Sequence, residues 1–393
     1  MEREIKKRIL PYPYPYYFFT VVLIALIGFF DAVYLAISHY RVYTDMAYES
    51  FCAISKAINC DTVSQSPYSI FWGVPVPVWG ILGYAFFLGA LFLAGQKRAE
   101  HKRLWVFLQL TAFSFCLYSV VLALISTYWI HSYCIMCILS YGVNLGLLYF
   151  VWIIRKRFDS TRFWTGLKND FKYIKQLKIK SAAVFGLPIL TACGLILFLP
   201  PYWQLKPIQP DFKIEHGLTQ EGQPYLGSSK AEFTITEFID YQCFQCRKMH
   251  FFLRRLIGRY PDKAKLIQRH FPMDSKVNPG VKTPLHVGSG KMALLAIYAS
   301  AKGKFWQMND LLFDMAARKK NFNLKEIAEK TGIDQRELAW ALNSKKVYQR
   351  LALDLKEGGE LGLEGTPGFL IEGKVYQGNI PYKVLERIFF KAK

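Results

Sequence analysis

The chain has 393 residues, of which 52% are apolar and 16% aromatic, and its formal net charge is +21. These fractions are unusual for a single soluble domain, and the apolar residues are unevenly distributed. Long uncharged runs fill much of the first half, whereas charged and apolar residues mix normally after Pro200. The basic residues cluster beside the apolar runs. The charge therefore indicates cytoplasmic membrane loops, and it argues against binding of nucleic acid.

Five apolar runs have the length that a helix needs to cross a lipid bilayer, about 20 residues. They cover residues 18–38, 74–94, 104–127, 134–154 and 181–199. The first is not a cleaved signal peptide, because it is too long, lacks a small-residue cleavage site and is followed by further spans. We predict an α-helical membrane bundle of four helices over residues 1–155, with a fifth transmembrane helix at 181–199.

Charge sets the expected topology of these spans. Basic clusters at residues 3–8, 97–103 and 155–180 indicate the cytoplasmic side, because positively charged loops are retained there. Residues 156–180 are expected as a basic cytoplasmic linker, although their aromatic and basic spacing also fits an amphipathic segment on the inner membrane surface. The loop 39–73, the turn 128–133 and everything after residue 199 then lie outside. This topology fits a bacterial inner membrane with the soluble domain in the periplasm.

Two cysteine pairs fall on the same outer side of the predicted bundle. Cys52 and Cys60 lie in the first outer loop, and Cys134 and Cys137 form a C-x-x-C sequence at the start of the fourth span. A disulfide relay needs one accessible pair and a second pair near the electron sink, because exchange proceeds through a mixed disulfide. The alternatives are an inert disulfide that staples the loop, or a zinc site with four thiolate ligands.

These residues resemble the vitamin K epoxide reductase family over roughly residues 15–155. Members of that family carry two loop cysteines, a Ser or Thr after them, and C-x-x-C at the start of a late helix; here Ser66 follows the loop pair, and the sequence C-I-M-C follows later. The resemblance implies that Cys137 faces a quinone, that Cys134 exchanges with Cys60, and that Cys52 reacts with the partner protein.

The resemblance also implies a quinone site. Ser66 and Tyr141 would be hydrogen-bonding groups at the quinone. The animal enzymes place an Asn near the start of the second span, but residues 74–78 read Val-Pro-Val-Pro-Val and offer no side-chain donor. The expected electron acceptor is therefore a respiratory quinone, ubiquinone or menaquinone, and vitamin K epoxide is disfavoured. No metal is expected.

Other polar or reactive residues in the spans have simpler interpretations. Cys116 and Cys193 lie inside apolar runs, where a single Cys usually packs as a small hydrophobe. Asp31 in the first span is costly in lipid, unless it reaches water at the outer end of that helix. His131 beside the C-x-x-C is interpreted as a surface-turn residue.

A Pro-rich linker, residues 200–230, leads to a soluble domain expected at residues 231–393. A strand-like run, residues 233–240, is followed by Cys243-Phe-Gln-Cys246 and a helical stretch at 247–259. A helix N-terminus carries a partial positive charge and free N–H groups, so it stabilises the thiolate of the first cysteine. We expect Cys243 to attack and Cys246 to be the buried resolving cysteine. His250 and His270 are interpreted as satisfying local hydrogen bonds.

Far downstream, Thr366-Pro367 precedes a short strand, a Glu372-Gly373 turn, a second strand and a last helix. Together with the strand, C-x-x-C and helix, this Thr-Pro looks like the cis-proline loop of the thioredoxin fold. Residues 215–393 are similar to DsbA-like proteins, with helices inserted between residues 271 and 358. The dipeptide Phe-Gln replaces that group's frequent Pro-His and supplies no cation, which suggests a milder oxidant.

The sequence thus predicts a quinone-dependent thiol oxidase that makes disulfide bonds in exported proteins carrying free thiols. Electrons would pass from substrate thiols to Cys243 and Cys246, then to the loop pair, then to the C-x-x-C of the fourth span, and finally to quinone. Fusion raises the effective concentration of the two halves to roughly millimolar. The alternatives are a membrane-anchored disulfide reductase or isomerase, and a non-enzymatic chaperone or metal-binding module with structural cysteines.

Overall fold

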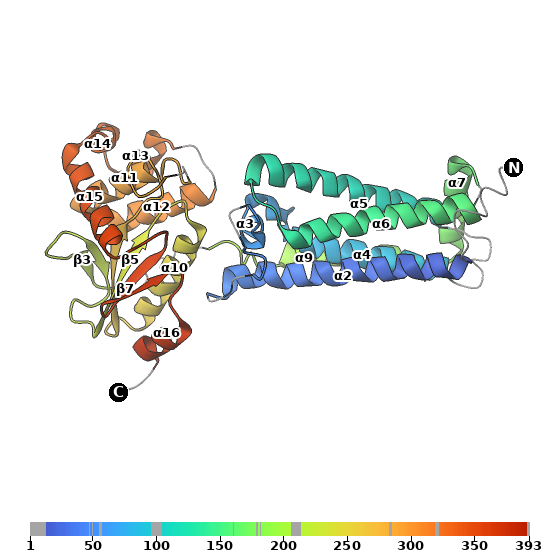
Figure 1. Ribbon diagram of the computed structural model, residues 1–393, viewed down its shortest axis with the longest axis horizontal. Helices are drawn as coiled ribbons and strands as arrows, with labels where there is room; N and C mark the ends of the chain where they lie inside the picture. The colour runs from blue at the N-terminus through green and yellow to red at the C-terminus, as the bar shows by residue number, and fades with distance from the viewer. Residues whose placement is uncertain are drawn as a thin grey trace. The chain divides into compact units, whose positions relative to one another are not determined.

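The computed structural model describes residues 13–46, 48, 50–54, 57–95, 104–159, 161–177, 180, 182–205, 214–282, 285–318 and 322–390. The chain forms two compact units, which are described separately: a helical unit, Met1–Thr44 with Tyr48–Trp203, and a mixed α/β unit, Gln204–Lys393 with Asp45–Ala47 (Figure 1). The basic clusters predicted at residues 3–8 and 97–103 lie outside the described residues.

Four apolar helices dominate the first unit, as predicted. They are α2 (Tyr14–Thr44), α4 (Val76–Ala94), α5 (Trp105–Ile125, extended by a π-helical turn at Ser126–Ile130) and α6 (Ile135–Phe158). Among the described residues, these four helices are long and apolar enough to cross a membrane. Helix α2 packs against α4 and α6, and α5 packs against α6 (Figure 1).

The interior of this bundle is apolar, and so is much of its surface. Phe87, Leu91 and Leu147 are fully buried in its core, whereas Phe19 and Leu145 are more than 60% exposed. Side chains that are apolar on the outside as well as the inside suit a bundle whose solvent is lipid, because no polar face is then needed.

The fifth predicted span is shorter than the others. A π-helical turn at Ala182–Gly186 continues into α9 (Leu187–Phe198), so that the apolar helix covers Ala182–Phe198. It packs against α4. Whether this segment crosses the membrane stays a prediction.

The basic segment expected as a linker contains a packed helix, α7 (Phe163–Gln176). The Asp170 carboxylate accepts hydrogen bonds from the backbone N–H groups of Leu104 (2.6 Å) and Phe107 (3.0 Å), and it thereby caps the start of α5 from a separate helix. The Tyr173 hydroxyl donates to the Leu93 carbonyl at 3.2 Å. Helix α7 is therefore part of the bundle, because its polar side chains bond backbone groups at the ends of neighbouring helices that would otherwise lack partners.

The loop between α2 and α4 folds into short elements. They are α3 (Cys60–Ser64), the 3-10 turn η1 (Pro67–Ser69), and a hairpin of β1 (Ile70–Phe71) with β2 (Val74–Pro75). Trp72 and Gly73 at its tip both have positive φ angles, as a two-residue hairpin turn of type I′ requires. The hairpin leads directly into α4.

The second unit is a six-stranded mixed sheet with helices. Its strands are β3 (His216–Leu218), β4 (Pro224–Leu226), β5 (Phe233–Ile239), β6 (Ala264–His270), β7 (Gly368–Ile371) and β8 (Lys374–Gln377), in the order β3-β4-β6-β5-β7-β8. Helix α10 (Phe244–Arg259) connects the parallel pair β5 and β6, and the other pairings are antiparallel. The predicted strand and helix around Cys243 are thus confirmed.

The inserted helices are also where the sequence predicted them. They are α11 (Ser289–Ala301), α12 (Phe305–Ala317), α13 (Leu324–Thr331), α14 (Gln335–Ala341) and α15 (Lys345–Glu360), all between β6 and β7 (Figure 1). The last helix, α16 (Tyr382–Phe389), follows β8. Met249 and Leu253 of α10 pack with Ile235, Phe369 and Ile388 in one fully buried cluster. This cluster fixes α10 against the sheet and so places the cysteine at its N-terminus.

Candidate redox-active sites

Cys243 is the N-cap residue of α10, directly after the turn that ends β5. Its Sγ accepts a hydrogen bond from the Cys246 backbone N–H at 3.2 Å, as an N-cap side chain does. Cys246 is fully buried one turn into the helix, where its Sγ accepts the Asp240 N–H at 3.5 Å. The first sulfur is therefore at the accessible end of the motif and the second is enclosed.

The two sulfurs differ in their tendency to ionise. The hydrogen bond with the Cys246 side chain, helped by the Cys246 backbone N–H, holds the pKa of Cys243 below its usual value. Burial and the neighbouring Cys243 sulfur raise the pKa of Cys246 well above its usual value. This arrangement can present Cys243 as the thiolate nucleophile and keep Cys246 protonated until it resolves a mixed disulfide.

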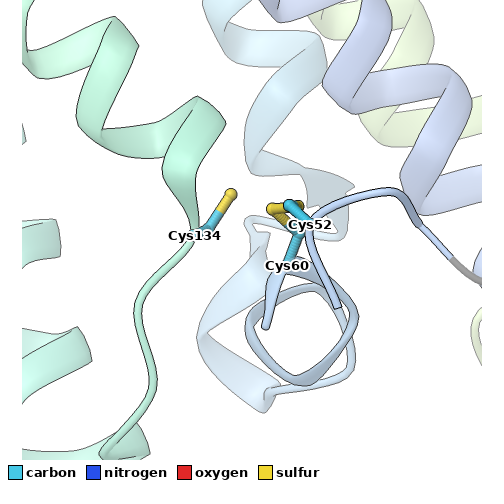
Figure 2. A group of neighbouring side chains, drawn as sticks. All are labelled: Cys52, Cys60 and Cys134. Atoms are coloured by element: carbon cyan, nitrogen blue, oxygen red, sulfur yellow. A yellow bond between two sulfur atoms is a disulfide. The ribbon is translucent and has the colours of Figure 1, made fainter. Parts of the chain in front are cut away.

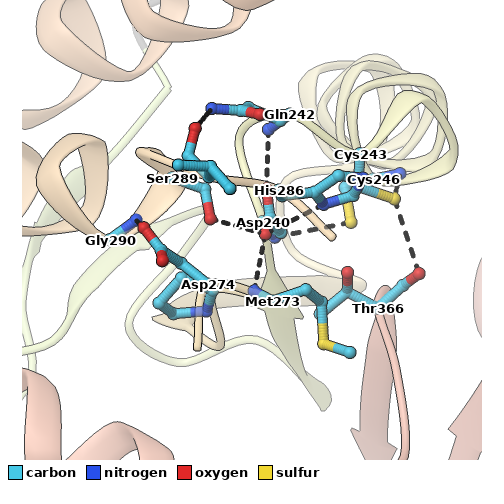
Figure 3. A network of polar contacts seen from close by, with 12 residues as sticks. Asp240, Gln242, Cys243, Cys246, Met273, Asp274, His286, Ser289, Gly290 and Thr366 are labelled. Carbon is cyan, nitrogen blue, oxygen red and sulfur yellow. Dashed lines mark hydrogen bonds and ion pairs between the residues drawn. The ribbon is translucent and has the colours of Figure 1, made fainter. Parts of the chain in front are cut away.

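The Thr-Pro loop lies against this cysteine pair. The Cys243 thiol donates to the Thr366 carbonyl at 3.4 Å, and the peptide bond between Thr366 and Pro367 is cis (Figure 3). The predicted cis-proline loop is thus confirmed as a backbone feature. A chain that binds along this loop would lie next to the attacking sulfur.

A polar group beside Cys243 could not be found from the sequence. Asp240 accepts hydrogen bonds from the Met273 N–H (2.7 Å) and the Ser289 hydroxyl (2.8 Å), and its Oδ2 lies 3.0 Å from His286 Nδ1 (Figure 3). The hydrogen bonds from Cys246 dominate the lowered pKa of Cys243; the Asp240 carboxylate raises this pKa, and His286 opposes Asp240 with a smaller lowering effect. An imidazole, which is a cation when it is protonated, thus reaches the motif from a loop 43 residues downstream.

A second polar cluster is buried in the same unit. The His250 imidazole contacts Glu237 through Nδ1 and accepts the Asn309 amide N–H at 3.0 Å through Nε2, and all three side chains are fully buried. His270 is also buried, which lowers its pKa to about 3. Both histidines were expected to satisfy local hydrogen bonds. The side-chain contacts of His250 agree with this expectation. For His270 the hydrogen bond is made by the backbone, whose N–H donates to Asp354 at 3.1 Å.

In the helical unit, Cys52 and Cys60 form a disulfide with their Cα atoms 5.7 Å apart. The Sγ atoms of Cys52, Cys60 and Cys134 all lie within 4.8 Å of one another, and the Cys134 sulfur points toward the disulfide (Figure 2). All three residues are at least 97% buried. The expected proximity of the loop pair to the C-x-x-C is therefore present.

Two backbone hydrogen bonds hold the loop beside the start of α6. The Asn59 N–H donates to the Tyr133 carbonyl at 2.9 Å, and the Tyr133 N–H donates to the Ala57 carbonyl at 2.8 Å. The Asn59 side chain also caps α3 by accepting the Thr62 N–H at 2.9 Å. The residues on either side of these bonds, Cys60 and Cys134, are brought together by this short parallel pairing.

Cys134 is the N-cap residue of α6, and its Sγ accepts the Cys137 N–H at 3.3 Å. Cys137, one turn further, lines a cavity of about 260 Å³ within the bundle. Ser66 and Tyr141, the two residues expected at the quinone, line the same cavity. The Ser66 hydroxyl donates to the Val63 carbonyl at 2.8 Å.

Several polar residues of this cavity were not found from the sequence. Asn144 of α6 accepts a hydrogen bond from the Tyr84 hydroxyl at 2.7 Å and donates to the Ser119 hydroxyl at 2.8 Å. His39 of α2 bonds the Ser69 hydroxyl at 3.3 Å and the Tyr202 hydroxyl at 2.8 Å. The segment 74–78 places Val76 and Pro77 on the cavity without a side-chain donor, whereas Asn144 brings a side-chain amide to it from α6. In the sequence, the one signal for these polar residues is that each lies on the same face of its helix as other residues that line the cavity.

The trio Cys52, Cys60 and Cys134 also has the spacing of metal ligands. In the disulfide-bonded form, however, the first two are not thiolates and only Cys134 keeps one. A structural zinc site needs four ligands. This form therefore does not provide the predicted alternative of a four-thiolate site.

Comparison with family models assigns both units. Residues 19–152 match the vitamin K epoxide reductase family, and residues 219–389 match thioredoxin. The first match covers most of α2 to α6 and includes the loop pair Cys52 and Cys60 and the C-x-x-C of Cys134 and Cys137. The second covers strands β4 to β8, the inserted helices and the C-x-x-C of α10.

Similar solved structures include a thioredoxin-like oxidoreductase from Silicibacter pomeroyi, 24% identical, which covers 42% of this chain and 90% of its own with a TM-score of 0.34. Another is alpha-DsbA1 from Wolbachia pipientis, 20% identical, which covers 44% of this chain and 91% of its own with a TM-score of 0.35.

Curated relatives include the Na(+)/H(+) antiporter NhaA 3 from Salinispora tropica, 26% identical over 40% of this chain and 22% of its own length. The antiporter NhaA from Herminiimonas arsenicoxydans is 25% identical over 45% of this chain and 27% of its own length. The chain thus spans about a quarter of the length of these relatives. Over residues 19–152 the chain is thus similar to the vitamin K epoxide reductase family, and over residues 219–389 it is similar to thioredoxin.

Proposed function

We propose that this protein is a quinone-dependent thiol oxidase that forms disulfide bonds in exported proteins. Substrate thiols reduce the Cys243–Cys246 disulfide, which passes its electrons to Cys52 and Cys60. The loop pair then reduces Cys134 and Cys137, from which a membrane quinone takes the electrons. The loop cysteines and the thioredoxin-fold domain face the periplasm, and the helices lie in the inner membrane of a bacterium.

The observation that carries this proposal is the position of the C-x-x-C of α6. Cys134 lies within 4.8 Å of both sulfurs of the loop disulfide, and Cys137 lines the cavity. One turn of helix thus separates a sulfur that can exchange with a disulfide from a sulfur that faces a mainly apolar space. A relay needs both contacts, whereas a loop staple needs neither.

The cavity fits a quinone head group in chemical character. Its walls are mainly apolar, with a few hydroxyl and amide groups, which is the usual composition of a small-molecule site. Tyr141 and Ser66 would orient the ring oxygens, and Asn144 would hold the cavity wall in place through Tyr84. A quinone supplies an acceptor for two electrons and two protons.

In each cycle two S–H bonds break and one S–S bond forms. The dithiol of Cys134 and Cys137 becomes a disulfide, two electrons leave with the quinone, and two protons complete the quinol. The next exchange with the reduced loop pair restores the dithiol. The thioredoxin-fold domain is tethered to this site, which raises the rate of their encounter without a stable interface.

The test measures quinol formation by the full chain in detergent, with a reduced thiol substrate and a soluble short-chain quinone. Wild-type protein and Cys116→Ser should form quinol at equal rates, whereas Cys137→Ala should fall to the background rate because the sulfur at the cavity is lost. Equal rates in all three proteins would exclude Cys137 as the donor to quinone.

The second candidate, a disulfide reductase or isomerase, is favoured by the uncharged Phe244-Gln245 dipeptide. In a reductase, electrons would flow from the Cys243–Cys246 pair to the client protein, opposite to the direction in an oxidase. The reduction potential of the Cys243–Cys246 pair separates the two functions, because an oxidase needs a pair that is readily reduced by its clients.

A further inference from the structure

Asp31 is a buried carboxyl group in a membrane-spanning helix. It lies in α2 and is 4% exposed, so it does not reach water at the end of the helix as the sequence allowed. One carboxyl oxygen accepts a hydrogen bond from the Ser140 hydroxyl. The other, Oδ1, is buried without a hydrogen-bond partner among the described residues. Ionisable groups inside a membrane are costly, and they commonly mark proton or ion pathways.

Its position connects Asp31 to the electron path. Ser140 lies three residues after Cys137 on α6, which places both on one face of the helix, and both line the cavity. The titratable groups that interact with Asp31 are Cys134 and Cys137 on α6 and Tyr84 on α4. The Tyr84 hydroxyl also interacts with Ser140. The carboxyl group is thus linked through the Ser140 hydroxyl to the cavity that Cys137 lines.

The chemistry of this site needs a group that holds a proton. Oxidation of the dithiol releases two protons, and each thiol has to lose its proton before its sulfur can attack. The cavity is mainly apolar, so water is a poor acceptor there. A carboxylate with one free oxygen, bridged to the cavity by a serine hydroxyl, can take a proton and return it.

We propose that Asp31, acting through the Ser140 hydroxyl, takes the proton of the Cys137 thiol and delivers it to the reduced quinone. This inference rests on the proposed function. Two S–H bonds break, one S–S bond and two O–H bonds form, and two electrons move to the quinone. Asp31 begins and ends the cycle as a carboxylate, and the second proton comes from Cys134.

Asp31 could alternatively serve only to tie α2 to α6. Asp31→Asn separates the two roles, because an amide keeps the size and the hydrogen bond with Ser140 but cannot carry the proton. Asp170→Asn is the matched control, since it removes a buried carboxylate at the other end of the bundle, where it caps α5 away from the cavity.

The experiment uses the full chain in lipid nanodiscs with a short-chain quinone. Three quantities are measured from acidic to alkaline pH: quinol formation in a single turnover, exchange between Cys134 and the loop disulfide, and the melting temperature. Asp31→Asn should slow quinol formation about 100-fold, the scale of general acid–base catalysis, and should change its dependence on pH. The exchange rate and the melting temperature should stay close to the wild type, and Asp170→Asn should form quinol normally.

Two results would overturn the inference. Quinol formation at the wild-type rate in Asp31→Asn would show that the carboxyl carries no proton. Equal slowing of quinol formation and of the exchange, with a lower melting temperature, would show a structural tie. A wild-type protein that forms no quinol would instead refute the proposed function itself, and the proton role with it.

Discussion

The two C-x-x-C motifs of this protein share their local geometry and differ in their surroundings. Cys134 and Cys243 are both N-cap residues, and their sulfurs accept the N–H of Cys137 and Cys246 at 3.3 Å and 3.2 Å. This shared cap follows from the spacing alone, because an N-cap side chain reaches the N–H group three residues later. In both motifs the helix N-terminus favours a thiolate on the first sulfur.

Their surroundings assign the sulfurs opposite partners. In the thioredoxin-fold domain the first cysteine is partly exposed and lies beside Asp240, His286 and the Thr366 carbonyl, and the second is fully buried. In the membrane domain the first sulfur is buried against a disulfide, and the second faces a cavity. The motif sets which sulfur caps the helix, and the surrounding fold sets which groups lie next to that sulfur.

The largest effect is expected from removing the second cysteine of each motif. Cys246→Ala should leave Cys243 in a mixed disulfide with a client thiol. Cys137→Ala should leave Cys134 in an internal disulfide with a loop cysteine, because no sulfur remains to resolve it. Non-reducing gels and mass spectrometry of digested protein identify the linked cysteines. If Cys134 of Cys137→Ala is instead alkylated as a free thiol and the Cys52–Cys60 disulfide stays intact, the loop disulfide is structural and does not take part in exchange.

A smaller effect should follow from removing the cation beside Cys243. The pKa of Cys243 is lowered, so its thiolate persists at a pH where an ordinary thiol is protonated. His286 contributes only when it is protonated, so His286→Gln should slow alkylation of Cys243 at acidic pH and have no effect at alkaline pH. A two- to fivefold loss, about 0.4–1 kcal/mol, is the scale of a partly exposed ion pair.

Ser289→Ala is the control for this experiment, because Ser289 donates to the same Asp240 oxygen at 2.8 Å and carries no charge. It should leave the pH profile of alkylation unchanged. Equal slowing of alkylation in both variants would mean that the hydrogen bonds to Asp240 control the reactivity of Cys243 and that the charge of His286 does not.

The smallest effect concerns how each site is held. Asn59 caps α3 in the loop that carries Cys60, and Asn323 caps α13, which lies in the helical insertion of the other unit. Replacing either with Ala should cost about 1 kcal/mol of stability. Only Asn59→Ala should also slow exchange between Cys134 and the loop disulfide, measured by stopped-flow alkylation. A similar slowing in Asn323→Ala would argue against a local role for the loop.

The sequence by itself determined the elements and the reactive motifs. Four spans and the strand–C-x-x-C–helix of the second unit were predicted because hydrophobic runs, helix caps and the Thr366-Pro367 dipeptide are local signals, readable without knowing the fold. The family resemblances of both halves rested on the same local signals. The packed helix within residues 156–180 was missed as a fixed element, because its stabilising contacts with Leu104 and Phe107 lie more than 60 residues away.

Only the tertiary structure decided which groups meet. The pairing of Asn59 with Tyr133 brings Cys134 to the loop disulfide, and the loop before α11 brings His286 to Asp240. The packing of α2 on α6 turns Asp31 from a residue at a helix end into a buried carboxyl on Ser140. Each of these contacts joins residues distant in the chain, and their positions depend on how whole helices pack, which no local pattern of residues specifies.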